Sequence, residues 1–181
     1  RATPRRVSNI VFMCMVEPLA NYDSTSAAIR RIHRDMEIGA RHLTVSTVGL
    51  VPGILRMAAE ELPVGLAVSL HAADDELRDE LVPINRTYPL PVLMSACEEY
   101  VEATHRRLSF EWAMIDGVSD RFVDAERLAR LARPLRAHVN LIPLNPTPGY
   151  AVRGSSGNRV RAFRGELERL GVNVTVRDTR G

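Results

Sequence analysis

The sequence predicts an α/β protein whose parallel sheet of βα units curves into an incomplete barrel. Short apolar runs alternate with helical stretches along the 181 residues, which is the order that parallel sheets require. Right-handed crossovers between such units wind the sheet into a curve. Polar residues follow several of the apolar runs, at the strand ends where α/β proteins place their sites. At 45% hydrophobic residues the chain can bury one core, so residues 1–181 are expected to form a single domain.

The first predicted strand is Val7–Met13, in which Ile10–Met13 form an apolar run without alternation. Such a run is typical of a strand that is covered on both faces. Pro18 cannot donate to a strand ladder, so the strand has to end before it. A helix is then expected over Ser24–Arg34, with Asn21 or Asp23 as its cap.

Further strands and helices alternate along the rest of the chain. The strands are predicted at His42–Thr47, Val64–Leu70, Leu108–Ile115, Ala137–Ile142 and Val172–Val176. The helices are predicted near Pro52–Ala58, from a cap at Asp74 or Asp75 to Leu81, and at Val92–Thr104, Ala125–Arg133 and Arg161–Leu170. Asp124 is the expected cap of the fourth of these helices and Gly171 the residue that ends the last. Tyr150–Arg159 is predicted to be a loop.

Composition restricts the functional classes. All 24 basic residues are Arg; guanidinium groups suit RNA phosphates, but the codon bias of a GC-rich genome gives the same pattern. The net charge of +2 is too small to argue for nucleic acid. Cys14 and Cys97 are too few for a disulfide framework or an iron–sulfur site. The absence of a signal peptide and of any apolar run of about 18 residues favours a cytoplasmic protein without a membrane partner. A start without Met favours a fragment.

Polar side chains stand at or just past the ends of several predicted strands. They are Glu17, Ser46, Ser69, His71 and Asn145. Because the carboxyl ends of parallel strands meet at one rim, these residues are expected to share a cleft. One carboxylate, two hydroxyls, one imidazole and one amide suit a polar small molecule that carries an amine, a ribose or a carboxylate. Each residue also has a plainer role available, as a turn former, a cap or a structural histidine.

Common catalytic and phosphate-binding motifs are absent from the sequence. It contains no GxGxxG, GxxxxGK[ST], GxSxG or HExxH. Gly154–Gly157 would allow contact with a phosphate, as would any flexible loop. A hydrolase triad of Ser69, His71 and Glu17 is conceivable, but the first two lie two positions apart on a strand, without the turn that exposes a nucleophile.

Several longer sequence segments resemble those of a known family. They are VFMCMVEPLANY, LTVSTVGLVPGI, LAVSLHAADDELRDELVPINRTYP, FEWAMIDGVSD, NLIPLNPTPG and VRDTRG. From Val7 to Gly181 the sequence resembles the radical S-adenosylmethionine RNA methyltransferases. Within them it is most similar to the branch that methylates C2 of an adenosine in 23S rRNA and in some tRNAs. The branch that methylates C8 and confers antibiotic resistance is the near alternative.

The resemblance implies a partial (βα)6 TIM-like barrel of the radical S-adenosylmethionine type, here the C-terminal portion that lacks the first strand and the cluster loop. S-adenosylmethionine would bind across the carboxyl ends of the strands. The positions that match the family's cofactor contacts are Val16, Glu17, Ser46, Ser69, Leu70, His71 and Asn145. By this resemblance, Glu17 would meet the methionine amine, and Ser69 to His71 the ribose and the methionine. Asn145 would lie on the methionine side.

The sequence also departs from the family pattern. Val16 replaces a Gly whose backbone approaches the cofactor, and Val48 replaces a Ser. The C-x3-C-x2-C motif for the 4Fe-4S cluster would lie upstream of this chain, and the methyl-carrying Cys beyond Gly181. The chain is therefore expected to hold no catalytic or metal-ligating residue and to be inactive alone, as a monomer. The competing classes are a metal-free hydrolase or lyase that uses His71 and Glu17, and a non-catalytic RNA-binding fragment.

Overall fold

Six parallel strands form one sheet, in the order β1-β2-β3-β4-β5-β6. The structure is a computed structural model, and it describes residues 7–13, 17–60, 62, 64–145 and 152–177. The strands are β1 (Ile10–Phe12), β2 (Leu43–Thr47), β3 (Gly65–Ser69), β4 (Leu108–Met114), β5 (His138–Pro143) and β6 (Val174–Val176). Each pairs in parallel with the next along the chain. The predicted α/β fold with a curved parallel sheet is confirmed.

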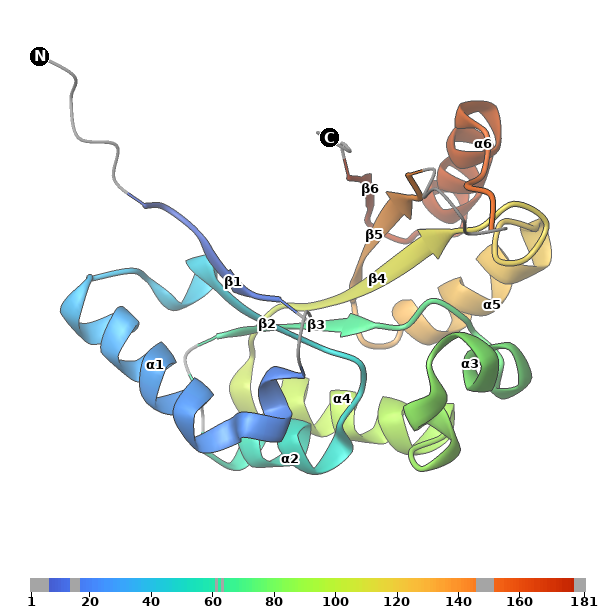
Figure 1. The fold of residues 1–181 in the computed structure, drawn as a ribbon. Helices are drawn as coiled ribbons and strands as arrows, with labels where there is room; N and C mark the ends of the chain where they lie inside the picture. Colours follow the sequence, from blue (N-terminus) through green and yellow to red (C-terminus); the bar gives the residue numbers. More distant parts are fainter. Residues whose placement is uncertain (1–6, 14–16, 61, 63, 146–151, 178–181) are drawn as a thin grey trace, which may run out of the picture.

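The helices lie on the convex side of this sheet (Figure 1). They are α1 (Tyr22–Asp35), α2 (Val51–Ala59), α3 (Asp75–Leu81), α4 (Leu90–Thr104), α5 (Phe122–Ala132) and α6 (Gly157–Arg169), with short 3-10 helices at Pro18–Asn21, Ala40–His42 and Pro83–Arg86. In the part of the chain that the structure describes, the concave side carries no α-helix. No helix of the described residues is long and apolar enough to cross a bilayer.

Buried apolar side chains and cavity-lining side chains alternate along β4 and mark the two faces of the sheet. Phe110, Trp112 and Met114 are fully buried under the helices, and the Trp112 ring stacks on Phe163 of α6 with centroids 6.2 Å apart. Ser109 and Glu111 point to the other face, where they line a cavity. Because successive side chains of a strand point to opposite faces, this alternation gives the sheet an apolar convex face and a polar concave one.

The prediction that the first strand is covered on both faces is wrong. Val11 and Met13 are 51% and 50% exposed, whereas Ile10 and Phe12 of the same segment pack against the core. β1 is an edge of the sheet, and within the described residues nothing covers its concave side. The apolar run therefore has one buried face and one exposed face.

Two helix boundaries also differ from the predictions. The α5 helix begins at Phe122 after Arg121, so Asp124 is not its cap. Its carboxylate instead accepts a hydrogen bond from the backbone N–H of Arg121 at 3.0 Å, the reciprocal half of a capping box. The α6 helix begins at Gly157, because the hydroxyl of Ser156 accepts from the Arg159 N–H, so the predicted loop is shorter.

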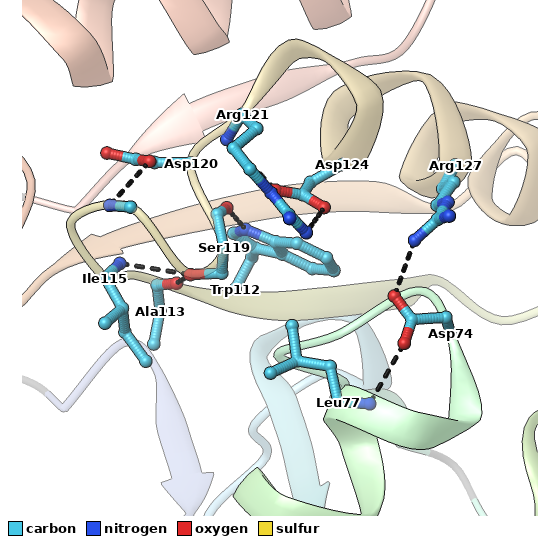
Figure 2. A network of polar contacts seen from close by, with 11 residues as sticks. Asp74, Leu77, Trp112, Ala113, Ile115, Ser119, Asp120, Arg121, Asp124 and Arg127 are labelled. Atoms are coloured by element: carbon cyan, nitrogen blue, oxygen red, sulfur yellow. Dashed lines mark hydrogen bonds and ion pairs between the residues drawn. The ribbon is translucent and has the colours of Figure 1, made fainter.

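Other predicted helix ends are confirmed. Asp74 caps α3 by accepting from the Leu77 N–H at 2.9 Å, and it also pairs with Arg127 of α5 at 2.8 Å (Figure 2). Gly171 follows α6 with a φ of 79°, a left-handed conformation that glycine adopts without strain. At the start of α1, Asn21 is the N-cap residue but its side chain makes no capping hydrogen bond.

Candidate functional site

The concave face of the sheet lines an open cavity of about 1010 Å³. Arg41, Arg106 and Arg107 line it near the amino ends of the strands, and His71 and Arg177 near the carboxyl ends. The strand residues between these ends are mostly small or polar. They include Thr44, Ser46, Ala67, Ser69, Ser109, Glu111, Asn140 and Thr175. The only carboxylate among these lining residues is that of Glu111.

The structure brings three of the predicted site residues together. Ser46, Ser69 and His71 line the cavity. Glu17 and Asn145 follow β1 and β5 at the same rim but do not line the cavity, and the side chain of Leu70 is fully buried in the core. Val16 lies outside the described residues.

Glu17 joins the loop after β1 to the end of β2. One carboxylate oxygen accepts from the Leu19 N–H at 3.0 Å, and the other accepts from the Val48 N–H at 2.8 Å. The first bond caps the short helix Pro18–Asn21. Each carboxylate oxygen can accept a second hydrogen bond, so Glu17 could also receive an ammonium group.

The backbone bends sharply where β3 ends. Both Leu70 and His71 donate their N–H to the carbonyl of Glu111, at 3.1 and 3.3 Å. His71 has a φ of 59°, in the left-handed region, and its Nδ1 accepts from the Ala113 N–H at 3.1 Å. Burial, with the charge of Arg78, lowers the pKa of His71 to about 4. The imidazole is therefore neutral at pH 7, and its proton is on Nε2.

Arg78 holds the ends of β2 and β3 in place from behind the site, a role that the sequence reasoning missed. It is fully buried, and its guanidinium donates to the carbonyls of Val48 at 2.9 Å and Leu70 at 3.1 Å. A third bond goes to the buried Asn85 side chain at 2.8 Å. Burial lowers the pKa of Arg78 to about 10, so it stays charged at neutral pH. In the sequence, the only sign of this role is that a basic residue follows Leu70 by eight positions.

Ser119 fixes the loop between β4 and α5 (Figure 2). Its hydroxyl donates to the Ala113 carbonyl at 2.6 Å and accepts from the Ile115 N–H at 3.0 Å. Its own carbonyl accepts from the Trp112 indole N–H at 2.9 Å. Ala113 also donates its N–H to the imidazole of His71. By binding the Ala113 carbonyl, Ser119 therefore helps to position this imidazole as well as the loop. The role of Ser119 was missed by the sequence reasoning.

A hydrogen-bonded chain of side chains crosses the cavity wall from β6 to β4. Thr175 donates to Asn140 at 2.6 Å, and Asn140 donates to one carboxylate oxygen of Glu111 at 2.7 Å. Desolvation raises the pKa of Glu111, against the opposing effects of Asn140 and of the charges on Arg177 and Arg107. Glu111 and Asn140 were also missed by the sequence reasoning; the available signal was a charged residue inside the predicted strand Leu108–Ile115.

The contacts do not support a hydrolase. Among the hydrogen bonds of the described residues, none joins Ser69 to His71 or His71 to Glu17. The Nδ1 atom of His71 accepts a hydrogen bond from the Ala113 N–H. In a catalytic triad this ring nitrogen would instead donate to a carboxylate. In the same part of the chain, no group of three or more His, Cys, Asp or Glu side chains is placed to hold a metal ion.

Comparison with solved structures defines the class of the fold. The chain superimposes on a radical SAM methyltransferase from Sphaerobacter thermophilus with a TM-score of 0.92 and 51% identity, over 98% of this chain and 52% of that one. It also resembles a domain of a pyruvate-formate lyase-activating enzyme from Bacteroides vulgatus, with a TM-score of 0.71 and 16% identity over 95% of this chain and 100% of that one. The fold is thus that of the radical SAM barrel.

Curated relatives identify the family more closely, although no family model matches the chain. A probable dual-specificity RNA methyltransferase RlmN from Frankia alni is 55% identical over 97% of this chain and 43% of its own length. Another from Pelotomaculum thermopropionicum is 51% identical over 98% of this chain and 49% of its own length. Over the segment that it spans, the chain belongs to the RlmN family. It spans about half the length of the curated relatives it matches.

Proposed function

We propose that the chain forms the C-terminal portion of the radical SAM core of an RNA methyltransferase, which modifies C2 of an adenosine in 23S rRNA and in tRNA. The observation that carries the proposal is the 50–55% identity to proteins named RlmN along nearly the whole chain. Residues 1–181 would act as one domain of a monomeric protein, in the cytoplasm where these RNAs are found.

The cavity residues fit S-adenosylmethionine. Ser69 offers a hydroxyl that can donate or accept, and neutral His71 offers an Nε2–H donor to a carboxylate or a ribose oxygen. Glu17 keeps acceptor capacity for the methionine ammonium at the neighbouring strand end. In this proposal Ser46 and Asn145 add polar contacts, Leu70 contributes through its main chain, and Val16 borders the methionine.

The residues of this chain do not fit an iron–sulfur cluster. Such clusters are held by cysteine thiolates, and the chain contains only Cys14 and Cys97. Cys97 is fully buried in α4, and burial raises the pKa of its thiol to about 12, which disfavours the thiolate. The cluster of the proposed enzyme therefore has its ligands outside these residues.

The test is a methylation assay with the protein expressed from its complete reading frame. Anaerobic reaction with S-adenosylmethionine, a reductant and a 23S rRNA fragment should give 2-methyladenosine, identified by mass spectrometry of nucleosides against standards. A Ser69→Ala variant should reduce the yield because it loses a cofactor contact. A product of 8-methyladenosine would assign the chain to the other branch, and no methylated adenosine would contradict the proposal.

A further inference from the structure

Glu111 lies in one row with three other polar residues on the cavity wall. Backbone pairing places Glu111 opposite Ser69 of β3 and Asn140 of β5, and Asn140 opposite Thr175 of β6. All four line the cavity. Because strands lie about 4.8 Å apart, the Ser69 and Glu111 side chains leave the sheet as nearest neighbours.

The hydrogen-bonded chain in this row has a direction. The single proton of the Thr175 hydroxyl goes to the Asn140 carbonyl oxygen, so the contact of His138 Nε2 with that hydroxyl, at 2.9 Å, is a donation to it. Asn140 then donates to Glu111. The donations of Thr175 and Asn140 both run toward β4, and the chain ends on a carboxylate, which only accepts when it is ionised.

Two polar atoms of this row remain without a partner in the described part of the chain. They are the second carboxylate oxygen of Glu111 and the hydroxyl of Ser69. Asn140, fixed by Thr175, presents a neutral amide to Glu111. The charges of Arg177 and Arg107 act on the carboxylate, but no ion pair of the described residues includes Glu111. The second carboxylate oxygen of Glu111 is not among the buried unpaired atoms and faces the open cavity. A ligand that displaces water from this oxygen has to supply a hydrogen bond in return, because a desolvated carboxylate without one costs free energy.

We propose that the free carboxylate oxygen of Glu111 accepts a hydrogen bond from a ribose hydroxyl of the bound nucleoside, with the Ser69 hydroxyl beside it. This inference rests on the proposed function, which supplies a cofactor that contains a ribose. Acidic side chains bind ribose hydroxyls in the same way in dinucleotide-binding folds. Asn140 and Thr175 are positioning residues, because they hold the carboxylate by its other oxygen.

The experiment compares nucleoside ligands that differ by one hydroxyl. Titration calorimetry measures S-adenosylhomocysteine and its 2′-deoxy and 3′-deoxy analogues on the protein from its complete reading frame. A hydrogen bond to a charged group predicts that one deoxy analogue binds about 10- to 100-fold more weakly than the parent. In Glu111→Gln, which keeps the shape and the contact with Asn140, this ratio should fall below about threefold. Glu102→Gln on α4, exposed and away from the cavity, should keep the wild-type ratio.

Other results of this titration would contradict the inference in different ways. A wild-type protein that binds all three ligands equally would overturn the inference, and this measurement needs no variant. An unchanged ratio in Glu111→Gln would overturn it as well. If that variant changes only the preference for S-adenosylmethionine over S-adenosylhomocysteine, the carboxylate faces the sulfonium and the ribose assignment is wrong. A wild-type protein that binds neither ligand would contradict the proposed function itself.

Discussion

His71 leaves β3 in a left-handed backbone conformation, and this sets the chemistry of its side chain. The turn directs Nδ1 onto the Ala113 N–H of β4, so only Nε2 remains for a ligand. Burial and the nearby Arg78 keep the ring neutral by lowering its pKa. At the scale of one residue, a backbone N–H fixes the orientation of the His71 ring, and burial and Arg78 fix its protonation.

The pKa of His71 predicts how stability depends on pH. It is about 4 in the folded protein and about 6.5 in the unfolded chain. Between these values the unfolded chain binds a proton that the folded protein does not, so the free energy of unfolding should fall as the pH drops from about 6.5 toward 4. Urea unfolding of His71→Asn, a residue that tolerates positive φ, should show a smaller fall over this range. Parallel curves for the two proteins would contradict the assignment.

Val16 provides a second prediction at this scale. By the family resemblance it stands where glycine approaches the methionine. If the backbone φ is positive there, a β-branched residue costs about 1–3 kcal/mol. Strain of that size weakens binding by roughly tenfold per 1.4 kcal/mol. In the protein from its complete reading frame, Val16→Gly should therefore bind S-adenosylmethionine about tenfold more tightly by titration calorimetry. Val92→Gly on the exposed side of α4 is the control. Equal affinities of Val16→Gly and wild type would show that the loop stays away from the ligand.

At the scale of elements, close contacts between neighbouring segments hold the rim. The loop after β4 is fixed by Ser119, and the loops after β2 and β3 are fixed by Arg78. The short helix Pro18–Asn21 packs on α2 where Gly53 leaves room for Leu19. Each of these contacts joins elements at the carboxyl ends of the strands, where the proposed ligand binds.

Two glycines in helices should respond in opposite ways to alanine. A Cβ at Gly53 would lie 2.6 Å from the Leu19 Cβ, so Gly53→Ala should destabilise the protein by about 1–3 kcal/mol. A Cβ at Gly165 of α6 would meet nothing within 4 Å, so Gly165→Ala should stabilise by about 0.5–1 kcal/mol through helix propensity. Urea denaturation measures both. A Gly53→Ala protein as stable as wild type would refute the proposed packing.

Ser119 gives a prediction for the β4–α5 loop. Ser119→Ala leaves the buried Ile115 N–H without its partner and removes a bond to Ala113, which should lower the free energy of unfolding by about 1–3 kcal/mol. Ser156→Ala, at the exposed start of α6, removes a capping bond and should cost about 1 kcal/mol. A loss at Ser119 no larger than that at Ser156 would argue against a fixed loop.

The described residues form an open, curved parallel sheet, with helices on the convex side and a polar cavity on the other (Figure 1). β1 and β6 are both edges, so the described sheet does not close on itself. An edge strand with exposed Val11 and Met13 offers unpaired backbone groups to a further segment. This openness agrees with a match to about half the length of its curated relatives.

At this scale we predict that the 181-residue chain by itself assembles no stoichiometric 4Fe-4S cluster. Its two cysteines are far apart in sequence, and Cys97 is buried in α4. Anaerobic reconstitution followed by iron analysis should find far less than one cluster per chain. The protein from its complete reading frame is the matched comparison. About four irons per chain with thiolate-to-iron charge-transfer absorption in the short form would contradict the prediction.

The sequence by itself determined the element order and some of the helix ends. Apolar runs separated by helical segments predicted all six strands. Asp74 was a correct cap because its partner, Leu77, is three residues away. Such features rest on interactions within a few residues, which a single sequence contains.

Only the tertiary structure decided which strand face is covered and which polar groups meet. Val11 looked buried, but β1 is an edge strand, and the position of a strand in a sheet depends on pairing between distant segments. Glu111 receives its partner from Asn140, 29 residues away, and Arg78 reaches Val48, 30 residues away. Hydrogen bonds between distant residues follow from the register of the strands, which the local pattern of side chains does not specify.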